Sequence, residues 1–181
     1  MRWLVVFSIL GVSLFANAKI VRLIQLDPGV WRGSQPTTPE DYQQLKSLGI
    51  KTILNLRWDD SVAESKSLAE ANGFQFFNIP IVAADGPTDD DIKKAFAVIL
   101  DKAEQPVYFH CTLGRDRTGL IAALYRVRVQ NEDPQKAYDE WVGLGFARGF
   151  LRKMDAYFKN STGLVASHPQ CDVTLGASPA L

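Results

Sequence analysis

Short apolar runs alternate with longer amphipathic runs between residues 21 and 159 of this 181-residue chain. Thr38-Pro39 is typical of a helix start, and Ile92, Phe96, Ile99 and Leu100 share one helical face. We expect strands over 21–26, 29–32, 50–56, 74–81 and 107–109, and helices over 38–48, 61–72, 88–103, 120–129, 133–144 and 149–159. This alternation predicts an α/β fold whose central, mostly parallel sheet is flanked by helices. Such sheets bind ligands at the carboxyl ends of their strands.

The first 18 residues have the pattern of a secretory signal peptide. Arg2 is followed by an apolar run from Trp3 to Phe15, and Ala16-Asn17-Ala18 is a small-x-small cleavage site. This run of 13 residues is shorter than the roughly 20 that span a membrane. We therefore expect a signal peptide over 1–18, one domain over 19–160 and a loosely ordered tail over 161–181. The mature protein would be exported, periplasmic or secreted, with no membrane anchor.

The composition is that of an ordinary globular domain, with 46% hydrophobic residues, 22% charged residues and a formal net charge of zero. A neutral surface argues against nucleic acid or an anionic membrane as the general partner. We expect a monomer in which any attraction for anions is local to one pocket.

The segment 107–119 carries the chemistry, and reads Val-Tyr-Phe-His-Cys-Thr-Leu-Gly-Arg-Asp-Arg-Thr-Gly. A strand, a tight loop and a helix in this order direct backbone N–H groups and a helix N-terminus at an anion. Cys111 would be a thiolate nucleophile there, because helix N-termini and cations favour the thiolate. Arg117 matches two phosphate oxygens, Gly114 lets the loop curl with a positive φ, and Thr118 can cap the helix. Sulfur would attack phosphorus to give a cysteinyl-phosphate that water hydrolyses, with neither metal nor cofactor.

With His110, Cys111, Arg117 and Thr118 at these positions, the chain resembles the cysteine-dependent protein-tyrosine and dual-specificity phosphatases. It resembles the small bacterial dual-specificity type and is similar to tyrosine-phosphatase-like phytases. The resemblance covers roughly residues 28–160 and implies their α/β fold. It implies that Cys111 is the nucleophile, that Arg117 clamps the phosphate, that Thr118 eases departure of the thiolate, and that His110 orients the loop. The loop residues expected to bind the substrate phosphate are Thr112, Leu113, Gly114, Arg115 and Asp116.

The departing oxygen needs a proton, which members of this superfamily take from an Asp on a loop about thirty residues before the cysteine. Thr88 and Asp91 form a capping pattern, and the other carboxylates of that first turn complement the helix dipole, so these residues have structural explanations. Asp85, in a flexible loop just before the helix, is therefore the expected general acid. Asp116 is the rival, since related bacterial and phosphoinositide phosphatases carry an Asp there; an ion pair with a neighbouring arginine is the alternative.

Arg57 follows a predicted strand at the edge where the pocket should lie. It is a candidate for a second phosphate contact, and a surface ion pair with Asp59 or Asp60 is the competing interpretation. Arg32, Arg115 and Arg148 are weaker candidates for the same role.

Cys171 lies in the polar tail and is either a spare thiol or the partner of a reversible bond with Cys111 that shields the nucleophile.

The expected substrate is a phosphorylated small molecule or a phosphoprotein. Inositol polyphosphates come first, phosphoproteins second and phosphoinositide lipids third. Two other classes stay open: a sulfurtransferase, which also uses a cysteine loop at a strand end, and a phosphate-binding module without catalysis.

Overall fold

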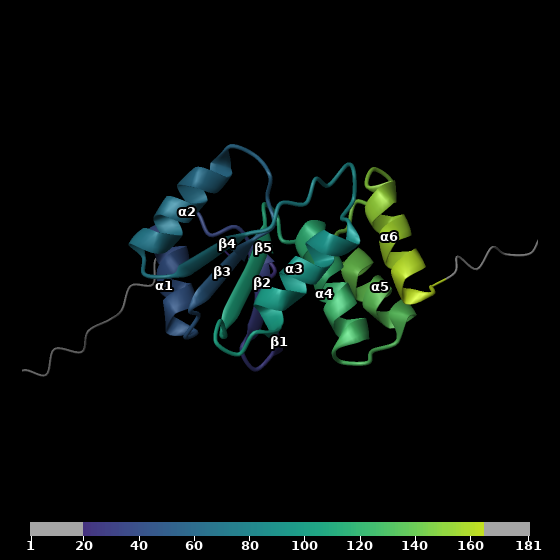
Figure 1. Cartoon of the computed structure of the whole chain (residues 1–181), viewed down its shortest axis with the longest axis horizontal. Coiled ribbons are helices and arrows are strands. Elements are labelled where there is room, and N and C mark those ends of the chain that lie inside the picture. Colours follow the sequence, from purple (N-terminus) through teal and green to yellow (C-terminus); the bar gives the residue numbers. More distant parts are fainter. Residues whose placement is uncertain (1–19, 165–181) are drawn as a thin grey trace, which may run out of the picture.

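The computed structural model describes residues 20–164, so the predicted signal peptide and Cys171 lie outside the described part of the chain. A five-stranded sheet has the order β1-β2-β5-β3-β4 (Figure 1). Its strands are β1 (Ile24–Asp27), β2 (Val30–Ser34), β3 (Thr52–Asn55), β4 (Gln75–Asn78) and β5 (Val107–Cys111). β1 is antiparallel to β2 and every other pairing is parallel. The predicted α/β fold with a mostly parallel sheet is confirmed.

Helices cover both faces of the sheet (Figure 1). They are α1 (Pro39–Ser47), α2 (Ser61–Ala71), α3 (Asp89–Leu100), α4 (Arg117–Arg128), α5 (Pro134–Gly143) and α6 (Arg152–Thr162). Ile53 and Tyr108 pack with α1 and α2, whereas their neighbours Leu54 and Phe109 pack with α3 to α6. This division follows from the alternation of side chains along a strand. None of the helices within residues 20–164 is long and apolar enough to cross a membrane.

Several elements differ in length from the sequence prediction. The predicted strand 74–81 is shortened to β4, because pairing with β3 ends at Asn55 and Asn78. The helix expected from residue 120 begins at Arg117, so Thr118 lies inside its first turn and is not the cap. The last helix runs to Thr162, past the predicted domain end at 160.

The register places three strand ends at one edge. Cys111 is opposite Ser34 of β2, and His110 is opposite Asn55 of β3. Because β5 is the central strand, the segments after β2 and β3 lie on either side of the loop that follows Cys111. Residues near positions 35, 57 and 112 are thereby brought together at the carboxyl edge of the sheet.

Candidate active site

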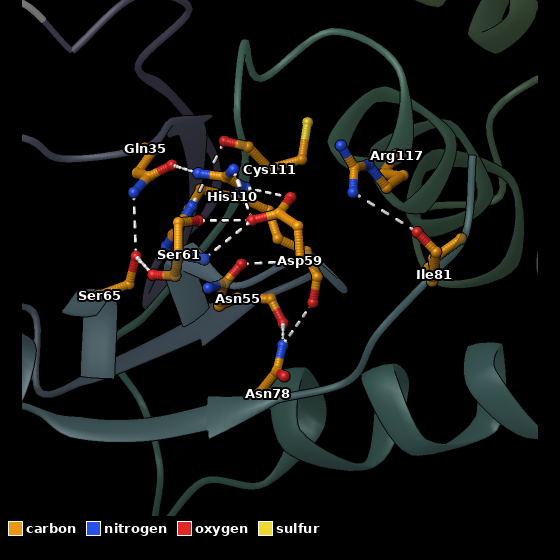
Figure 2. Close-up of polar contacts among 11 residues, drawn as sticks. Gln35, Asn55, Asp59, Ser61, Ser65, Asn78, Ile81, His110, Cys111 and Arg117 are labelled. Carbon is orange, nitrogen blue, oxygen red and sulfur yellow. Dashed lines mark hydrogen bonds and ion pairs between the residues drawn. The ribbon is translucent and has the colours of Figure 1, made fainter. Parts of the chain in front are cut away.

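The loop 112–116 joins the buried end of β5 to the first turn of α4. Cys111 is buried, with 2% of its surface exposed. Figure 2 shows Cys111 at the end of its strand with Arg117 next to it in this view. The predicted nucleophile and phosphate clamp are thus held by two rigid elements, with the short loop between them.

Four consecutive carbonyls of this loop accept hydrogen bonds from donors outside it. The pairs are Gln35 N to Thr112 O (3.2 Å), Arg22 Nη1 to Leu113 O (3.0 Å), Arg32 Nη2 to Gly114 O, and Trp141 Nε1 to Arg115 O (2.9 Å). In a planar trans peptide the N–H points opposite to the C=O. Carbonyls that face the scaffold therefore turn the N–H groups of residues 113–116 away from it, toward the inside of the loop. Converging N–H groups of this kind form an anion-binding concavity.

Gly114 allows the loop to curl in this way. Its φ is +68°, and a Cβ there would lie 2.5 Å from the carbonyl carbon of Gly33. A side chain would therefore meet both an unfavourable backbone conformation and the backbone of β2. The positive φ predicted for this glycine is confirmed.

Arg117 and Thr118 each carry a buried polar atom without a hydrogen-bond partner within residues 20–164: Arg117 Nε and Thr118 Oγ1. Arg117 Nη1 lies 3.5 Å from the carbonyl oxygen of Ile81, at the limit of a hydrogen bond. Buried polar groups normally have hydrogen-bond partners. Donors that lack a partner and lie beside converging backbone N–H groups are suited to binding the oxygens of an anion. The Thr118 hydroxyl does not cap α4, contrary to the sequence expectation.

His110 is buried at the end of β5, with 1% of its surface exposed. Burial lowers the pKa of this imidazole from 6.5 to about 4, against the smaller opposing effect of the Cys111 backbone contact. Its Nδ1 lies 3.3 Å from the Cys111 carbonyl oxygen. Its ring stacks on that of Tyr108, with the two ring centroids 5.8 Å apart. These contacts fit the predicted role of orienting the loop.

Arg32 supports the loop from within the protein. Only 1% of its surface is exposed, and burial lowers the pKa of its guanidinium to about 10. Its Nη2 donates to the Gly114 carbonyl. Arg32 was a weaker candidate for a phosphate contact, and in this structure it donates to a loop carbonyl on the side that faces the protein interior.

Asp116 uses both carboxylate oxygens in structural contacts. Oδ1 accepts from the backbone N–H of Ala147 at 3.0 Å, and Oδ2 accepts from Arg115 Nε at 2.9 Å. The carboxylate ties the loop to the segment between α5 and α6. This is the ion pair that the sequence left as the alternative to catalysis.

Asp85 lies in the loop between β4 and α3, which passes the site at Ile81, whose carbonyl oxygen is 3.5 Å from Arg117 Nη1. Its side chain is 70% exposed, and Oδ1 lies 3.2 Å from Lys153 Nζ on α6. Its backbone N–H donates to the Val82 carbonyl at 3.0 Å in a turn. The predicted acid is thus on a surface loop that is anchored to α6.

Arg57 follows β3 and is held in a polar network with Gln35 and Asp59, two residues that Figure 2 labels. Its Nη2 and Nε contact Asp59 at 2.7 and 3.1 Å, and its Nη1 donates to Gln35 Oε1. Hydrogen bonding from Ser61 (2.6 Å) and from Arg57 lowers the pKa of the Asp59 carboxyl. In this structure Arg57 therefore forms the ion pair with Asp59 that the sequence analysis gave as the competing interpretation.

Three donors to the loop carbonyls were missed in the sequence: Arg22, Gln35 and Trp141. Gly119 offers an indirect signal for Trp141, because a Cβ at that position would lie 2.2 Å from the indole ring. Nothing local marks Arg22, which is 91 residues from its partner Leu113.

A five-stranded α/β fold with a Cys-x5-Arg-Thr loop at the end of its central strand defines a protein of the cysteine-dependent phosphatase superfamily. Residues 13–154 match the sequence model of a family described as DSP-PTPase phosphatase fused to NAD+ kinase, and the chain belongs to this family.

Two curated relatives have similar sequences. The chain is 30% identical over 127 residues to the inositol diphosphatase DSP4 of Arabidopsis thaliana, covering 68% of this chain. It is 29% identical over 143 residues to the dual specificity protein phosphatase TpbA of Pseudomonas aeruginosa, covering 78% of this chain. Each alignment spans 63% of the relative's own length.

Solved structures have the same fold. The crystal structure of P. aeruginosa TpbA has a TM-score of 0.65 and 27% identity, over 77% of this chain and 84% of that one. The catalytic core of the PP-IP phosphatase SIW14 from S. cerevisiae has a TM-score of 0.65 at 21% identity, over 82% of this chain and 92% of that one, and shows the fold alone.

Proposed function

We propose that this chain is an exported, metal-independent phosphatase that hydrolyses inositol polyphosphates through a cysteinyl-phosphate. The observation that carries the proposal is the loop geometry: four carbonyls bound to the scaffold turn their N–H groups inward, between Cys111 and Arg117. Such an array stabilises the charge that develops on the equatorial oxygens of a transferring phosphoryl group.

The first step transfers the phosphoryl group to the enzyme. The Cys111 thiolate attacks phosphorus, the S–P bond forms, and the bond from phosphorus to the departing oxygen breaks. Arg117 and the loop N–H groups hold the three equatorial oxygens. Asp85 gives its proton to the departing alkoxide, which leaves as an alcohol.

The second step regenerates the thiolate. Water attacks phosphorus, gives a proton to the Asp85 carboxylate, and displaces sulfur as phosphate forms. Thr118 Oγ1 is buried on the first turn of α4 and makes no hydrogen bond within residues 20–164, so its hydroxyl is available to the departing sulfur. This arrangement fits the role that the sequence resemblance implies for Thr118.

Two arginines, one in the loop and one near it, favour a substrate with several phosphates. Arg115 is partly exposed, and Arg148 is an exposed neighbour of Ala147, whose N–H binds Asp116. Guanidinium groups match phosphate oxygens well. DSP4, by its name an inositol diphosphatase, supports the same class of substrate.

A phosphoprotein substrate is the second candidate. The supporting observations are the apolar side chains of Leu113 and Trp58, 46% and 57% exposed on segments at the carboxyl edge of the sheet. The relative TpbA has been crystallised in complex with pTyr, which an apolar rim would suit.

The deciding experiment compares kcat/KM for three substrates: inositol hexakisphosphate, an inositol that carries a pyrophosphate group, and a phosphotyrosine peptide. It is done under reducing conditions, with Cys111→Ser as the blank. At least tenfold preference for either inositol substrate supports the proposal, and preference for the peptide favours the protein phosphatase. Phosphate binding without turnover would leave a phosphate-binding module. Thiosulfate turnover without phosphate release would indicate a sulfurtransferase.

The export part of the proposal rests on the sequence pattern of residues 1–18. It is tested by expressing the full chain in a bacterium and determining the N-terminus of the product. A protein that begins at Lys19 and is released with the periplasmic fraction supports export, whereas an intact N-terminus inside the cell contradicts it.

A further inference from the structure

Arg22 joins the signature loop to a distant part of the chain. Its Nη1 donates to the Leu113 carbonyl at 3.0 Å, and its Nε donates to the Leu144 carbonyl at 2.7 Å. Leu113 lies in the middle of the loop and Leu144 is the cap at the end of α5. One guanidinium therefore sets the position of a loop peptide relative to a helix end.

The backbone around Arg22 is shaped for this contact. Arg22 has φ +56°, a left-handed conformation that is uncommon outside glycine, asparagine and aspartate. The preceding residue, Val21, is fastened to the end of β2: its N–H donates to Ser34 Oγ and its carbonyl accepts from Ser34 N–H, both at 2.9 Å. The surrounding structure maintains the unfavourable conformation of Arg22, which allows its guanidinium to reach Leu113 and Leu144.

The bound carbonyl determines what its peptide offers to a ligand. Because Leu113 C=O points at Arg22, the N–H of Gly114 points into the loop. Gly114 has no Cβ, so no side chain opposes rotation of this peptide to another backbone conformation. A donor that fixes its carbonyl would therefore keep one phosphate-binding N–H in place.

We propose that Arg22 is a positioning residue for phosphate binding, acting through the Leu113–Gly114 peptide without touching the substrate. The inference rests on the proposed phosphatase function but not on the choice of an inositol substrate. It is accordingly tested with 4-nitrophenyl phosphate as substrate and with inorganic phosphate as a competing anion.

Two variants separate the side chain from the backbone. Arg22→Met removes the guanidinium and keeps an unbranched apolar stem of similar bulk up to the position of Nε. Arg22→Asn also removes it, but asparagine tolerates the left-handed conformation better, so its folding should suffer less. Arg126→Met is the matched control, since Arg126 is also half-buried and pairs with Glu140 at 3.1 Å, at the end of α4 away from the loop.

The expected result is a loss in phosphate binding and in turnover for both Arg22 variants. Binding of inorganic phosphate should weaken about tenfold, the loss of one hydrogen bond to a charged group. kcat/KM should fall roughly 10- to 100-fold, as for a misplaced transition-state contact. Arg126→Met should lower the Tm and leave both values within about twofold of wild type.

The proposal is overturned if Arg22→Asn binds phosphate and turns over substrate as wild type does, whatever its Tm, because Arg22 would then be a structural tie only. If the wild type binds phosphate but releases none from any substrate, the proposed function fails. The phosphate affinity of Arg22→Asn would still decide the role of Arg22.

Discussion

Lys153 on α6 lies 3.2 Å from the carboxylate of Asp85, the predicted proton donor. A second contact reinforces this one, since Tyr157 of α6 donates to Asp89 at 2.7 Å, at the start of α3. Gly86 also packs on the backbone of Lys153, where a Cβ would lie within 3.4 Å. The acid loop and α6 thus meet at the surface, and Asp85 must release Lys153 to approach a leaving group.

Replacing Asp85 by Asn should slow hydrolysis of substrates with poor leaving groups by about 100-fold, because an alkoxide must be protonated as it departs. An inositol that carries a pyrophosphate group should be much less affected, because the group that departs from its terminal phosphorus is a phosphate. The measurement is kcat on both substrates at neutral pH. Asp90→Asn is the control, as Asp90 is an exposed neighbour that pairs with Lys94. Equal losses on both substrates would contradict the assignment of Asp85.

Asp116 is expected to stabilise the loop and not to supply the proton. Asp116→Asn keeps an oxygen for the Ala147 N–H, so kcat on a poor leaving group should stay within about threefold of wild type. Asp116→Ala leaves that N–H unpaired and should cost about 1–2 kcal/mol of unfolding free energy. Urea unfolding and kcat for the two variants test this. A 100-fold loss in kcat for Asp116→Asn would make Asp116 the acid.

Asp59 is expected to restrain Arg57. Asp59→Asn retains an acceptor for Ser61, removes a negative charge beside the loop and weakens the hold on the Arg57 guanidinium. The KM for inositol hexakisphosphate should fall by roughly 3- to 10-fold, in line with removal of one repulsive charge and gain of one cation. The KM for 4-nitrophenyl phosphate should hardly change. The double variant Asp59→Asn with Arg57→Met should not show this lower KM for inositol hexakisphosphate. If its KM is as low as that of Asp59→Asn alone, Arg57 does not cause the effect.

Burial of His110 predicts a loss of stability in mild acid. Because the pKa falls from 6.5 to about 4 on folding, the unfolded chain binds a proton in that range that the folded protein does not. The folded state is therefore destabilised as the pH drops from about 6.5 to about 4, by up to about 3 kcal/mol. Denaturant midpoints at several pH values should fall more steeply for wild type than for His110→Asn. Parallel curves would show that His110 does not carry this effect.

The spacing of the signature was enough to predict a nucleophile and its clamp, because Cys111, Arg117 and the loop between them form one local unit of strand, turn and helix. Gly114 was predictable for the same reason, since its positive φ is a local requirement of the turn. The alternation of apolar runs likewise predicted the sheet and both layers of helices.

Local spacing could not tell which arginines face the substrate. Arg32 lies in a strand that pairs with β5, and its burial beneath the loop depends on the order of the strands. Arg57 and Asp59 are two residues apart, so an ion pair and a phosphate contact were equally compatible with the sequence. The fold adds a contact that the sequence did not predict: Gln35, which follows β2 on the far side of β5, accepts a hydrogen bond from the same guanidinium.

The amino-acid sequence by itself determined that the loop curls at Gly114, and it predicted which atom attacks and which group clamps the phosphate. Only the tertiary structure decided what holds the loop in that shape. Its carbonyls are bound from 77 residues (Gln35), 91 residues (Arg22) and 26 residues (Trp141) away along the chain. The physical reason is that the residues of a loop determine its type of turn by their own conformational preferences. The direction of each peptide depends on hydrogen-bond donors that only the packing of distant elements brings within reach.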